Sequence, residues 1–246
     1  MQHKERWKPT KFVIKDSVLK ASRDETHVSV ASRLMVDCIA AFYETILPKN
    51  AHGKLLDLGC GNVPLFEKYQ SLVEENTCVD WGNTLHKNEY LDLEADLNEP
   101  LPLADNTFDT VILSDVLEHI RRPEQLIQEI NRVLKSGGTF IMNVPFFYHL
   151  HEEPFDFFRY TKHALRSMSE ENGFEVVYLE PLGGIPEILA DIIAKYFVGF
   201  PVIGKSISKF VQWKVRVLNK TAFGKRISTK TAQRFPLAYG MVAKKI

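Results

Sequence analysis

The sequence is poor in cysteine and has no long uncharged apolar run. Its three cysteines, Cys38, Cys60 and Cys78, match neither a disulfide framework nor a zinc site, which favours a reducing compartment. No run of 18 uncharged apolar residues occurs, and no charged segment followed by an apolar stretch opens the chain. We therefore expect a cytoplasmic protein without a membrane span or a standard secretion signal.

Acidic residues are absent from the last part of the chain. The sequence has 31 basic and 31 acidic side chains, but every acid lies at or before Asp191, and 12 Lys and Arg residues follow it. The two segments therefore carry formal charges of −12 and +12. Such segregation is typical of a surface for anionic lipid, nucleic acid or an acidic partner, and equally of a tail that folds against its own acidic body.

The most informative stretch is KLLDLGCG at residues 54–61. Its leucines lead into Gly59 and Gly61, which predicts a buried strand ending in a turn that a ligand can approach closely. Asp57 adds a carboxylate able to hold an ammonium group. Nineteen positions after Gly61, a second apolar segment ends on Asp80, the spacing at which an acid accepts both hydroxyls of a ribose.

Strands and helices are expected to alternate along the chain. Strands are predicted at 54–58, 77–80, 91–97, 108–113, 139–144, 174–179 and 237–243. Helices are predicted at 29–47, where Pro48 would end the first, and at 64–72, 123–135, 161–172 and 187–198. This order predicts an α/β fold with a doubly wound, mostly parallel sheet.

Four segments follow from this reading: an N-terminal arm and helix (1–50), a core (51–180), an insertion (181–236) and a last strand (237–246). The insertion is far longer than an ordinary connection, which indicates a function of its own. After its first helix, aromatic and basic residues interleave, and residues 213–218 alternate like a strand.

Six motifs occur in order over roughly residues 53–178: LLDLGCG, CVD, EADL, LSDVLEHI, RPEQLIQEINRVLKSGG and TFIMNVP. Together they resemble the class I S-adenosylmethionine-dependent methyltransferases, in particular small-substrate enzymes with LEHI and RVLKxGG signatures. The resemblance implies a seven-stranded sheet with a reversed last strand, and S-adenosyl-L-methionine as cofactor. It also implies the cofactor-binding residues: Asp57, Gly59 and Gly61 at the methionine half, Asp80 at the ribose, Asp96 and Leu97 at the adenine, and Ser114 at the sulfonium.

An aromatic-rich loop at 149–161 follows the fifth predicted strand, at the edge where an acceptor would lie. His149 and His151 are candidate bases, because the proton of an alcohol acceptor has to leave around the transition state. They are equally loop histidines capped by Glu152 or Glu153. A third ligand at a suitable spacing is not evident, so no metal site is predicted.

Further polar residues of this region have two open interpretations. An anionic or sugar acceptor could be bound by Asp156, Arg159 and Tyr160. Equally, these residues could form an ion pair that fixes the loop. Glu118 and His119 are structural or adjacent to the cofactor.

The predicted function is methyl transfer to a small or glycan-type acceptor at oxygen. The glycan element comes from the PFDFFRYT run, which resembles methyltransferases encoded with bacterial surface-glycan enzymes. The alternative is a non-catalytic scaffold that binds S-adenosylmethionine or S-adenosylhomocysteine, or attaches to a membrane. A nicotinamide enzyme would need a third glycine where Pro64 stands, and no P-loop motif occurs.

Two interpretations of the insertion (181–236) stay open. The aromatic and basic residues of 187–226 suit a peripheral contact with the inner membrane face, and equally a lid on the acidic body or a dimer contact. A nucleic-acid partner is not expected. The oligomeric state does not follow from the sequence.

Overall fold

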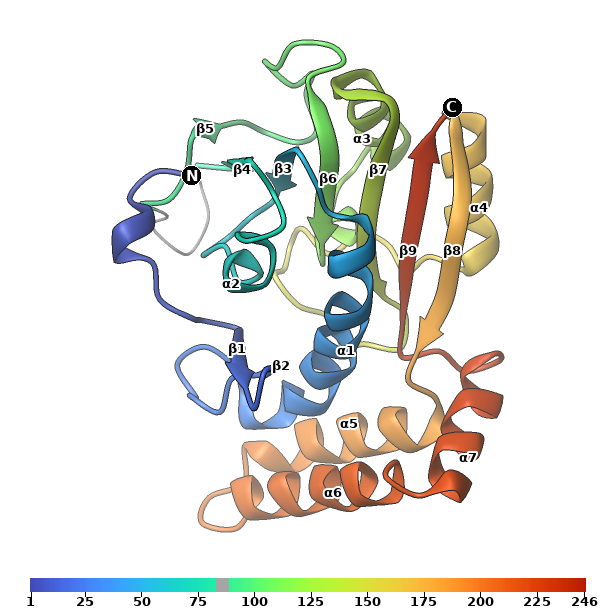
Figure 1. Cartoon of the computed structure of the whole chain (residues 1–246). Coiled ribbons are helices and arrows are strands. Elements are labelled where there is room, and N and C mark those ends of the chain that lie inside the picture. Colours follow the sequence, from blue (N-terminus) through green and yellow to red (C-terminus); the bar gives the residue numbers. More distant parts are fainter. Residues whose placement is uncertain (83–88) are drawn as a thin grey trace.

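The computed structural model describes residues 1–82 and 89–246, which form an α/β fold around one seven-stranded sheet (Figure 1). The strand order is β5-β4-β3-β6-β7-β9-β8. The strands are β3 (Lys54–Leu58), β4 (Glu75–Asp80), β5 (Leu93–Glu94), β6 (Phe108–Ser114), β7 (Leu134–Pro145), β8 (Phe174–Leu182) and β9 (Ala238–Lys245). β3 to β7 pair in parallel, whereas β9 runs antiparallel between β7 and β8. The predicted mostly parallel sheet with a reversed last strand is confirmed.

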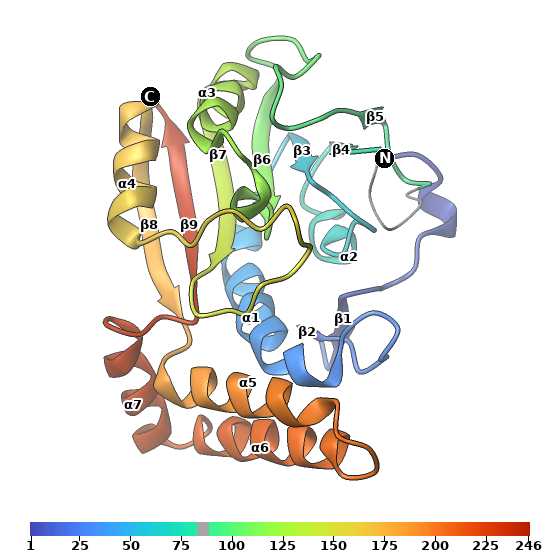
Figure 2. The same cartoon turned by 180° about the vertical axis from the view of Figure 1, so that it is seen from behind.

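Helices cover both faces of the sheet, as Figures 1 and 2 show. The helices are α1 (Arg33–Asn50), α2 (Phe66–Tyr69), α3 (Pro123–Val133), α4 (Lys162–Glu171), α5 (Ile185–Val198), α6 (Gly204–Leu218) and α7 (Ala222–Ala232). Buried side chains of α1 and α2 share one apolar cluster with Leu55 and Ile112, whereas those of α3 and α4 share the other with Leu56 and Val111. Because successive strand residues point to opposite faces, strands buried on both sides are apolar throughout.

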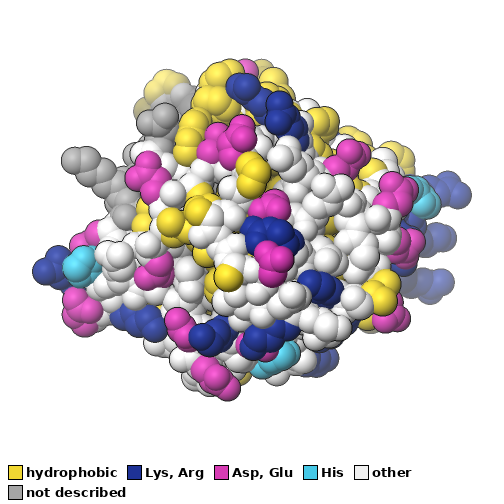
Figure 3. Space-filling view, turned by 90° about the horizontal axis from the view of Figure 1, so that it is seen from above, with side chains coloured by type: hydrophobic (Ala, Val, Ile, Leu, Met, Phe, Trp, Pro, Cys, Tyr) yellow, Lys and Arg dark blue, Asp and Glu magenta, His cyan; other side chains and the backbone are white. Residues whose placement is uncertain are grey.

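Parallel register brings the ends of the central strands together. Leu58 of β3 pairs with Val79 of β4 and with Leu113 of β6, so the residues that follow all lie at the carboxyl edge of the sheet. Figure 3 shows the opposite edge, where acidic and basic side chains are interspersed over the surface. Because ligands of open parallel sheets bind at the carboxyl ends of the strands, a functional site is expected at the carboxyl edge.

The N-terminal segment has more structure than the predicted arm. Residues 12–21 form an antiparallel hairpin of β1 (Phe12–Lys15) and β2 (Val18–Ala21), and Phe12 packs into the core. Asp16 and Ser17 make the turn with positive φ angles, a conformation that Gly and Asn usually signal, so the residue types did not predict this hairpin. The first predicted helix, 29–47, was placed a few residues too early: Val30–Ser32 form a 3-10 turn, and α1 begins at Arg33 and continues through Pro48 to Asn50.

Three other local predictions were wrong in extent or type. The strand expected at 91–97 is reduced to β5, and the helix expected at 64–72 to α2. Residues 213–218 lie in helix α6, not in a strand, and α6 packs against α5 to make a hairpin below the carboxyl edge (Figures 1 and 2). In the described part of the chain, no helix is both long enough and apolar enough to cross a membrane.

One buried amide fastens the hairpin to the core. Gln212 of α6 is 1% exposed; its amide nitrogen donates to the carbonyl of Val30 (2.6 Å), and its Oε1 accepts from the Leu34 amide (2.8 Å). Arg216 pairs with Asp37 of α1 at 2.8 Å. The insertion is therefore held against the helix that precedes the first core strand.

Candidate functional site

Two adjoining cavities open at the carboxyl edge of the sheet. The first has a volume of about 360 Å³ and the second about 350 Å³. Both are lined by Gly59, Gly61, Asp115 and Glu152. Further residues line one cavity each: Ser114, Glu118, Tyr148 and His151 the first, and Asp80, Trp81, Asp96, Leu97, His119 and Phe155 the second. The glycine turn, Gly59–Gly61, therefore lies between the two cavities and lines both of them.

The turn after β3 leaves its backbone open to a ligand. Gly59 and Gly61 have φ angles of +66° and +48°, and a Cβ placed on Gly61 would meet no atom within 4 Å. At Gly59 a Cβ would lie 2.4 Å from the side chain of Val116, so only glycine fits there. The Asp80 carboxylate fixes the turn, because it accepts from the amides of Gly61 (2.8 Å) and Trp81 (2.7 Å).

Asp80 keeps acceptor capacity for a ligand. Asp80 lines the second cavity. A carboxylate offers about four acceptor positions, and among the described residues the amides of Gly61 and Trp81 use two of them. Burial raises the pKa of Asp80, although the two amide hydrogen bonds oppose the shift. This acid is thus held rigidly beside the turn, as the spacing predicted.

Six of the predicted cofactor residues line the cavities: Gly59, Gly61, Asp80, Asp96, Leu97 and Ser114. Asp57 is placed differently. It is 3% exposed, accepts a hydrogen bond from the Tyr69 hydroxyl (3.1 Å), and is not among the residues lining either cavity. Burial raises the pKa of Asp57 to about 7. Its contact with an ammonium group stays a prediction.

A polar network that the sequence did not reveal supports the floor of the first cavity. Asn143 of β7 is fully buried, and its Oδ1 accepts from the hydroxyls of Tyr43 (2.7 Å) and Ser114 (2.9 Å). Its Nδ2 donates to Asp115, which also pairs with Lys11 at 2.6 Å. These residues come from distant segments, so no local motif could have grouped them.

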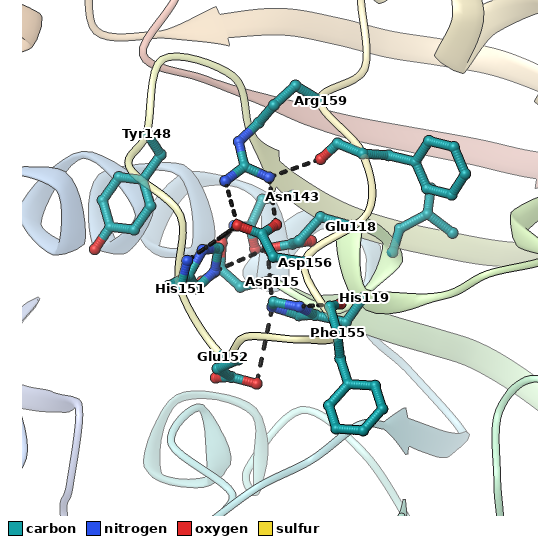
Figure 4. Close-up of polar contacts among 12 residues, drawn as sticks. Asp115, Glu118, His119, Asn143, Tyr148, His151, Glu152, Phe155, Asp156 and Arg159 are labelled. Atoms are coloured by element: carbon teal, nitrogen blue, oxygen red, sulfur yellow. Dashed lines mark hydrogen bonds and ion pairs between the residues drawn. The ribbon is translucent and has the colours of Figure 1, made fainter.

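The two candidate bases of the aromatic loop differ in position. His151 lines the first cavity, and Asp156 Oδ2 lies 3.0 Å from its amide and 3.2 Å from its Nδ1 (Figure 4). Although burial opposes the charged ring, the Glu118 and Asp156 carboxylates raise the pKa of His151. His149 is exposed as a residue and is not a lining residue; partial exclusion of water from its imidazole and the nearby Lys195 lower the pKa of that ring to about 4. His151 is thus the better placed of the two.

The predicted acceptor-binding residues form the framework of the loop. Arg159 makes a bidentate ion pair with Asp156 (2.5 and 2.7 Å) and donates to the carbonyl of His149 (3.2 Å). Tyr160 is 5% exposed, and its hydroxyl donates to the Leu117 carbonyl at 3.1 Å. None of the three is among the residues lining the two cavities. Of the two interpretations, the geometry shows the ion pair that fixes the loop.

Glu118 and His119 join His151 in a compact cluster between the two cavities (Figure 4). Glu118 lies on the 3-10 helix η3 (Leu117–His119) and is completely buried. Its Oε1 lies 3.8 Å from Nε2 of both His119 and His151. The sequence showed no third group beside the loop histidines, because η3 follows a different strand and only the fold brings it there. Burial raises the pKa of the Glu118 carboxyl.

Comparison with known proteins identifies a family. Residues 56–142 match the family described as "Methyltransferase domain". An uncharacterized protein of Methanocaldococcus jannaschii is 30% identical over 194 residues, which are 75% of this chain and 76% of that protein. The thiol S-methyltransferase of Rattus norvegicus is 33% identical over 96 residues, only 34% of this chain and 39% of that protein.

The fold is also similar to solved structures. A SAM-dependent methyltransferase from Archaeoglobus fulgidus superimposes with a TM-score of 0.56 at 19% identity, covering 86% of this chain and 93% of the other. At that identity the likeness concerns the fold.

The raised pKa of Asp57 makes a pH-dependent prediction. Between about pH 4 and 7 the folded protein holds a proton on Asp57 that the unfolded chain releases, so stability falls as pH rises through this window. Asp57→Asn removes the titration. Relative to wild type, the variant should gain about 2–4 kcal/mol between pH 4 and 8, measured by chemical denaturation without ligand.

A second variant, at an aspartate whose pKa is shifted the other way, tests the sign of this pH dependence. Partial burial opposes the shift, but Lys135 and the Lys54 amide lower the pKa of Asp109. Asp109→Asn should therefore lose stability relative to wild type as pH rises through the acid range. A pH-independent difference for Asp57→Asn would contradict the assignment.

Proposed function

This chain belongs to the class I S-adenosylmethionine-dependent methyltransferases, and we propose that it methylates an oxygen of a small or glycan-type acceptor held in the first cavity. The observation that carries this proposal is the arrangement of the glycine turn, Asp80 and the Glu118 cluster around two adjoining cavities. S-adenosylmethionine, when bound, supplies a methyl group on a positively charged sulfur.

The described residues fit this cofactor. Asp80, Asp96 and Leu97 all line the second cavity, which supports Asp80 as the acceptor of the ribose hydroxyls and the other two as adenine contacts. The rings of Trp81 and Phe155 meet edge to face at 5.3 Å and form an aromatic wall of that cavity. The Cβ-free side of Gly61 lets the methionine half pass toward the first cavity, where Ser114 lies.

The Glu118 cluster favours oxygen as the acceptor atom. As the new C–O bond forms and the S–C bond breaks, a hydroxyl acceptor loses its proton, and help with that proton is worth roughly 10²–10⁴-fold in rate. A thiol, with a pKa of about 8.5, needs much less help. A buried carboxylate between two imidazoles suits the harder of the two tasks. The glycan element of the proposal rests on the resemblance of the PFDFFRYT run alone.

The cofactor site can be tested by calorimetry with S-adenosylmethionine and S-adenosylhomocysteine. Asp80→Ala should weaken binding at least about tenfold, because it removes the acceptor of the ribose hydroxyls and frees the Gly61 amide. Glu75→Ala, at the other end of the same strand, is exposed and should bind like wild type. Equal loss in both variants, or no binding to folded wild type, would contradict the cofactor assignment.

The acceptor atom can be tested with an alkyl glycoside and the thiol that carries the same alkyl chain. S-adenosylhomocysteine release, followed by mass spectrometry, should be at least about tenfold faster with the hydroxyl compound, because the cluster lowers the cost of losing its proton. Methylation of the thiol alone would rule out oxygen. Cofactor binding without turnover on any hydroxylated acceptor would favour the non-catalytic scaffold.

We further propose that the insertion 181–236 acts as a unit that docks on the anionic inner face of a membrane. Large apolar side chains are exposed on α5, α6, α7 and the α5–α6 loop, where Val202 is 99% exposed. They are Leu189, Ile192, Tyr196, Phe200, Val202, Ile203, Phe210, Trp213 and Phe223. An exposed apolar surface interleaved with lysines suits the boundary between headgroups and acyl chains.

The charges of the insertion support an anionic partner. Lys205 and Lys209 reach Glu25 at 2.6 and 3.7 Å, so part of the tail does pair with the acidic body. For six others, no carboxylate of the described residues lies within ion-pair distance: Lys214, Lys220, Lys225, Arg226, Lys230 and Arg234. Lys195 of α5 stacks 3.5 Å above the ring of Tyr148, so the hairpin borders the first cavity. That border would let a lipid-linked acceptor reach the site.

Vesicle co-sedimentation tests the membrane proposal. Wild type should pellet with vesicles containing anionic lipid, and Val202→Asp should weaken pelleting at least about tenfold, because it removes an apolar contact and adds a repelled charge. Ile246→Asp is the control, since Ile246 is 79% exposed but lies at the far end of the molecule (Figure 1). Pelleting that ignores anionic lipid, or a loss equal in both variants, would sink the proposal.

A further inference from the structure

When both imidazoles are neutral, the Glu118 cluster presents acceptor atoms to one another without a donor between them. Glu118 is 0% exposed, and within the described residues neither of its carboxylate oxygens takes part in a hydrogen bond. The 3.8 Å separations from Oε1 to the two Nε2 atoms are too long for hydrogen bonds. A buried carboxylate left in this way is costly unless a positive charge compensates it.

The hydrogen bonds of the two rings fix which nitrogen faces Glu118. His119 Nδ1 lies 3.0 Å from the carbonyl of Phe155, which can only accept, so Nδ1 carries a proton, and in the neutral ring Nε2 presents a lone pair to Glu118. His151 Nδ1 similarly lies 3.2 Å from Asp156 Oδ2, whose carboxylate is already held by Arg159. Imidazoles that bind metals in proteins are oriented by such a carbonyl or carboxylate behind them.

The spacing of the three groups suits one ion. Their ligand atoms all lie within 4.8 Å of one another. Ligands at about 2.1 Å from a common ion are separated by up to about 4.2 Å, so the 3.8 Å pairs already fit and a small ring rotation closes the widest one. On the open side, the exposed carboxylate of Glu152 lies 3.9 Å from His119 Nε2.

We propose that Glu118, His119 and His151 bind a divalent transition-metal ion through Oε1 and the two Nε2 atoms. Two imidazoles with one carboxylate suit ions such as Zn²⁺ and Mn²⁺ better than Mg²⁺ or Ca²⁺, which prefer oxygen ligands. Glu118 and His151 line the first cavity and His119 the second, so the remaining coordination positions face the space between them. There the ion meets the acceptor.

The ion would replace direct proton acceptance by His151. Held by these three residues, the ion would lower the pKa of a bound acceptor hydroxyl, as it does for bound water, so that the hydroxyl proton could pass to water in the open cavity. The acceptor oxygen would form the C–O bond while the S–C bond breaks, and S-adenosylhomocysteine would leave with a neutral thioether sulfur. This role rests on the proposed function, whereas binding of the ion does not.

Calorimetric titration of the chelator-treated full chain with Mn²⁺ or Zn²⁺ tests the site. Wild type should bind one ion per chain. Glu118→Gln should weaken binding at least tenfold, because loss of even a residue that only hydrogen-bonds a metal ligand costs about 10- to 100-fold in affinity. His149→Ala, from the same loop but outside the cluster, should bind like wild type. In Co²⁺-loaded protein, His151→Ala should change the visible absorption bands, because a nitrogen ligand is lost.

Stability measurements give a second readout in case a variant folds poorly. With chelator, Glu118→Gln should be at least as stable as wild type, because it removes an uncompensated buried charge; with Mn²⁺, only wild type and His149→Ala should gain stability. No saturable binding to folded wild type, or binding that survives both Glu118→Gln and His151→Ala, would overturn the site. Methyl transfer unaffected by chelation would overturn its role. Ion binding without cofactor binding would refute the proposed function and leave the metal site standing.

Discussion

In the parallel pairs that β3 makes with β4 and β6, each strand ends at the same edge of the sheet, so hydrogen-bond register delivers the glycine turn, Asp80 and Ser114 to one place. The three are widely separated in sequence. A slip of one residue would turn every side chain of a strand to the other face, where it would not fit the closely packed apolar cluster already there. The proposed cofactor half of the site therefore depends on the same strand pairing that builds the core.

The proposed acceptor half depends on a loop that polar contacts hold against that edge. Tyr160 and His119 bond backbone carbonyls across the gap between η3 and the loop, and the Asp156–Arg159 pair holds the loop's shape. These contacts turn His119 and His151 toward Glu118. The insertion reaches the same region because Lys195 of α5 lies over the ring of Tyr148, which lines the first cavity.

Sequence reasoning succeeded where the signal was local and failed where it was not. The turn at Gly59, Asp80 at its end of β4, and α3 with its apolar stripe were predictable because pattern and spacing lie within one supersecondary unit. The helical state of 213–218 was missed because packing of α6 on α5 decides it. Glu118 and His151 lie in two segments that only the folded sheet brings together, so their spacing in the sequence could not predict their contact.

The most direct test of this account is a crystal structure of the full chain with S-adenosylhomocysteine. We expect the ribose on Asp80 and the sulfur at the junction of the two cavities, near Ser114 and facing the space beside Glu118, His119 and His151. A ligand bound away from the Gly59–Gly61 turn, or a sulfur pointing away from the first cavity, would contradict the claim that the carboxyl edge brings methyl donor and acceptor together.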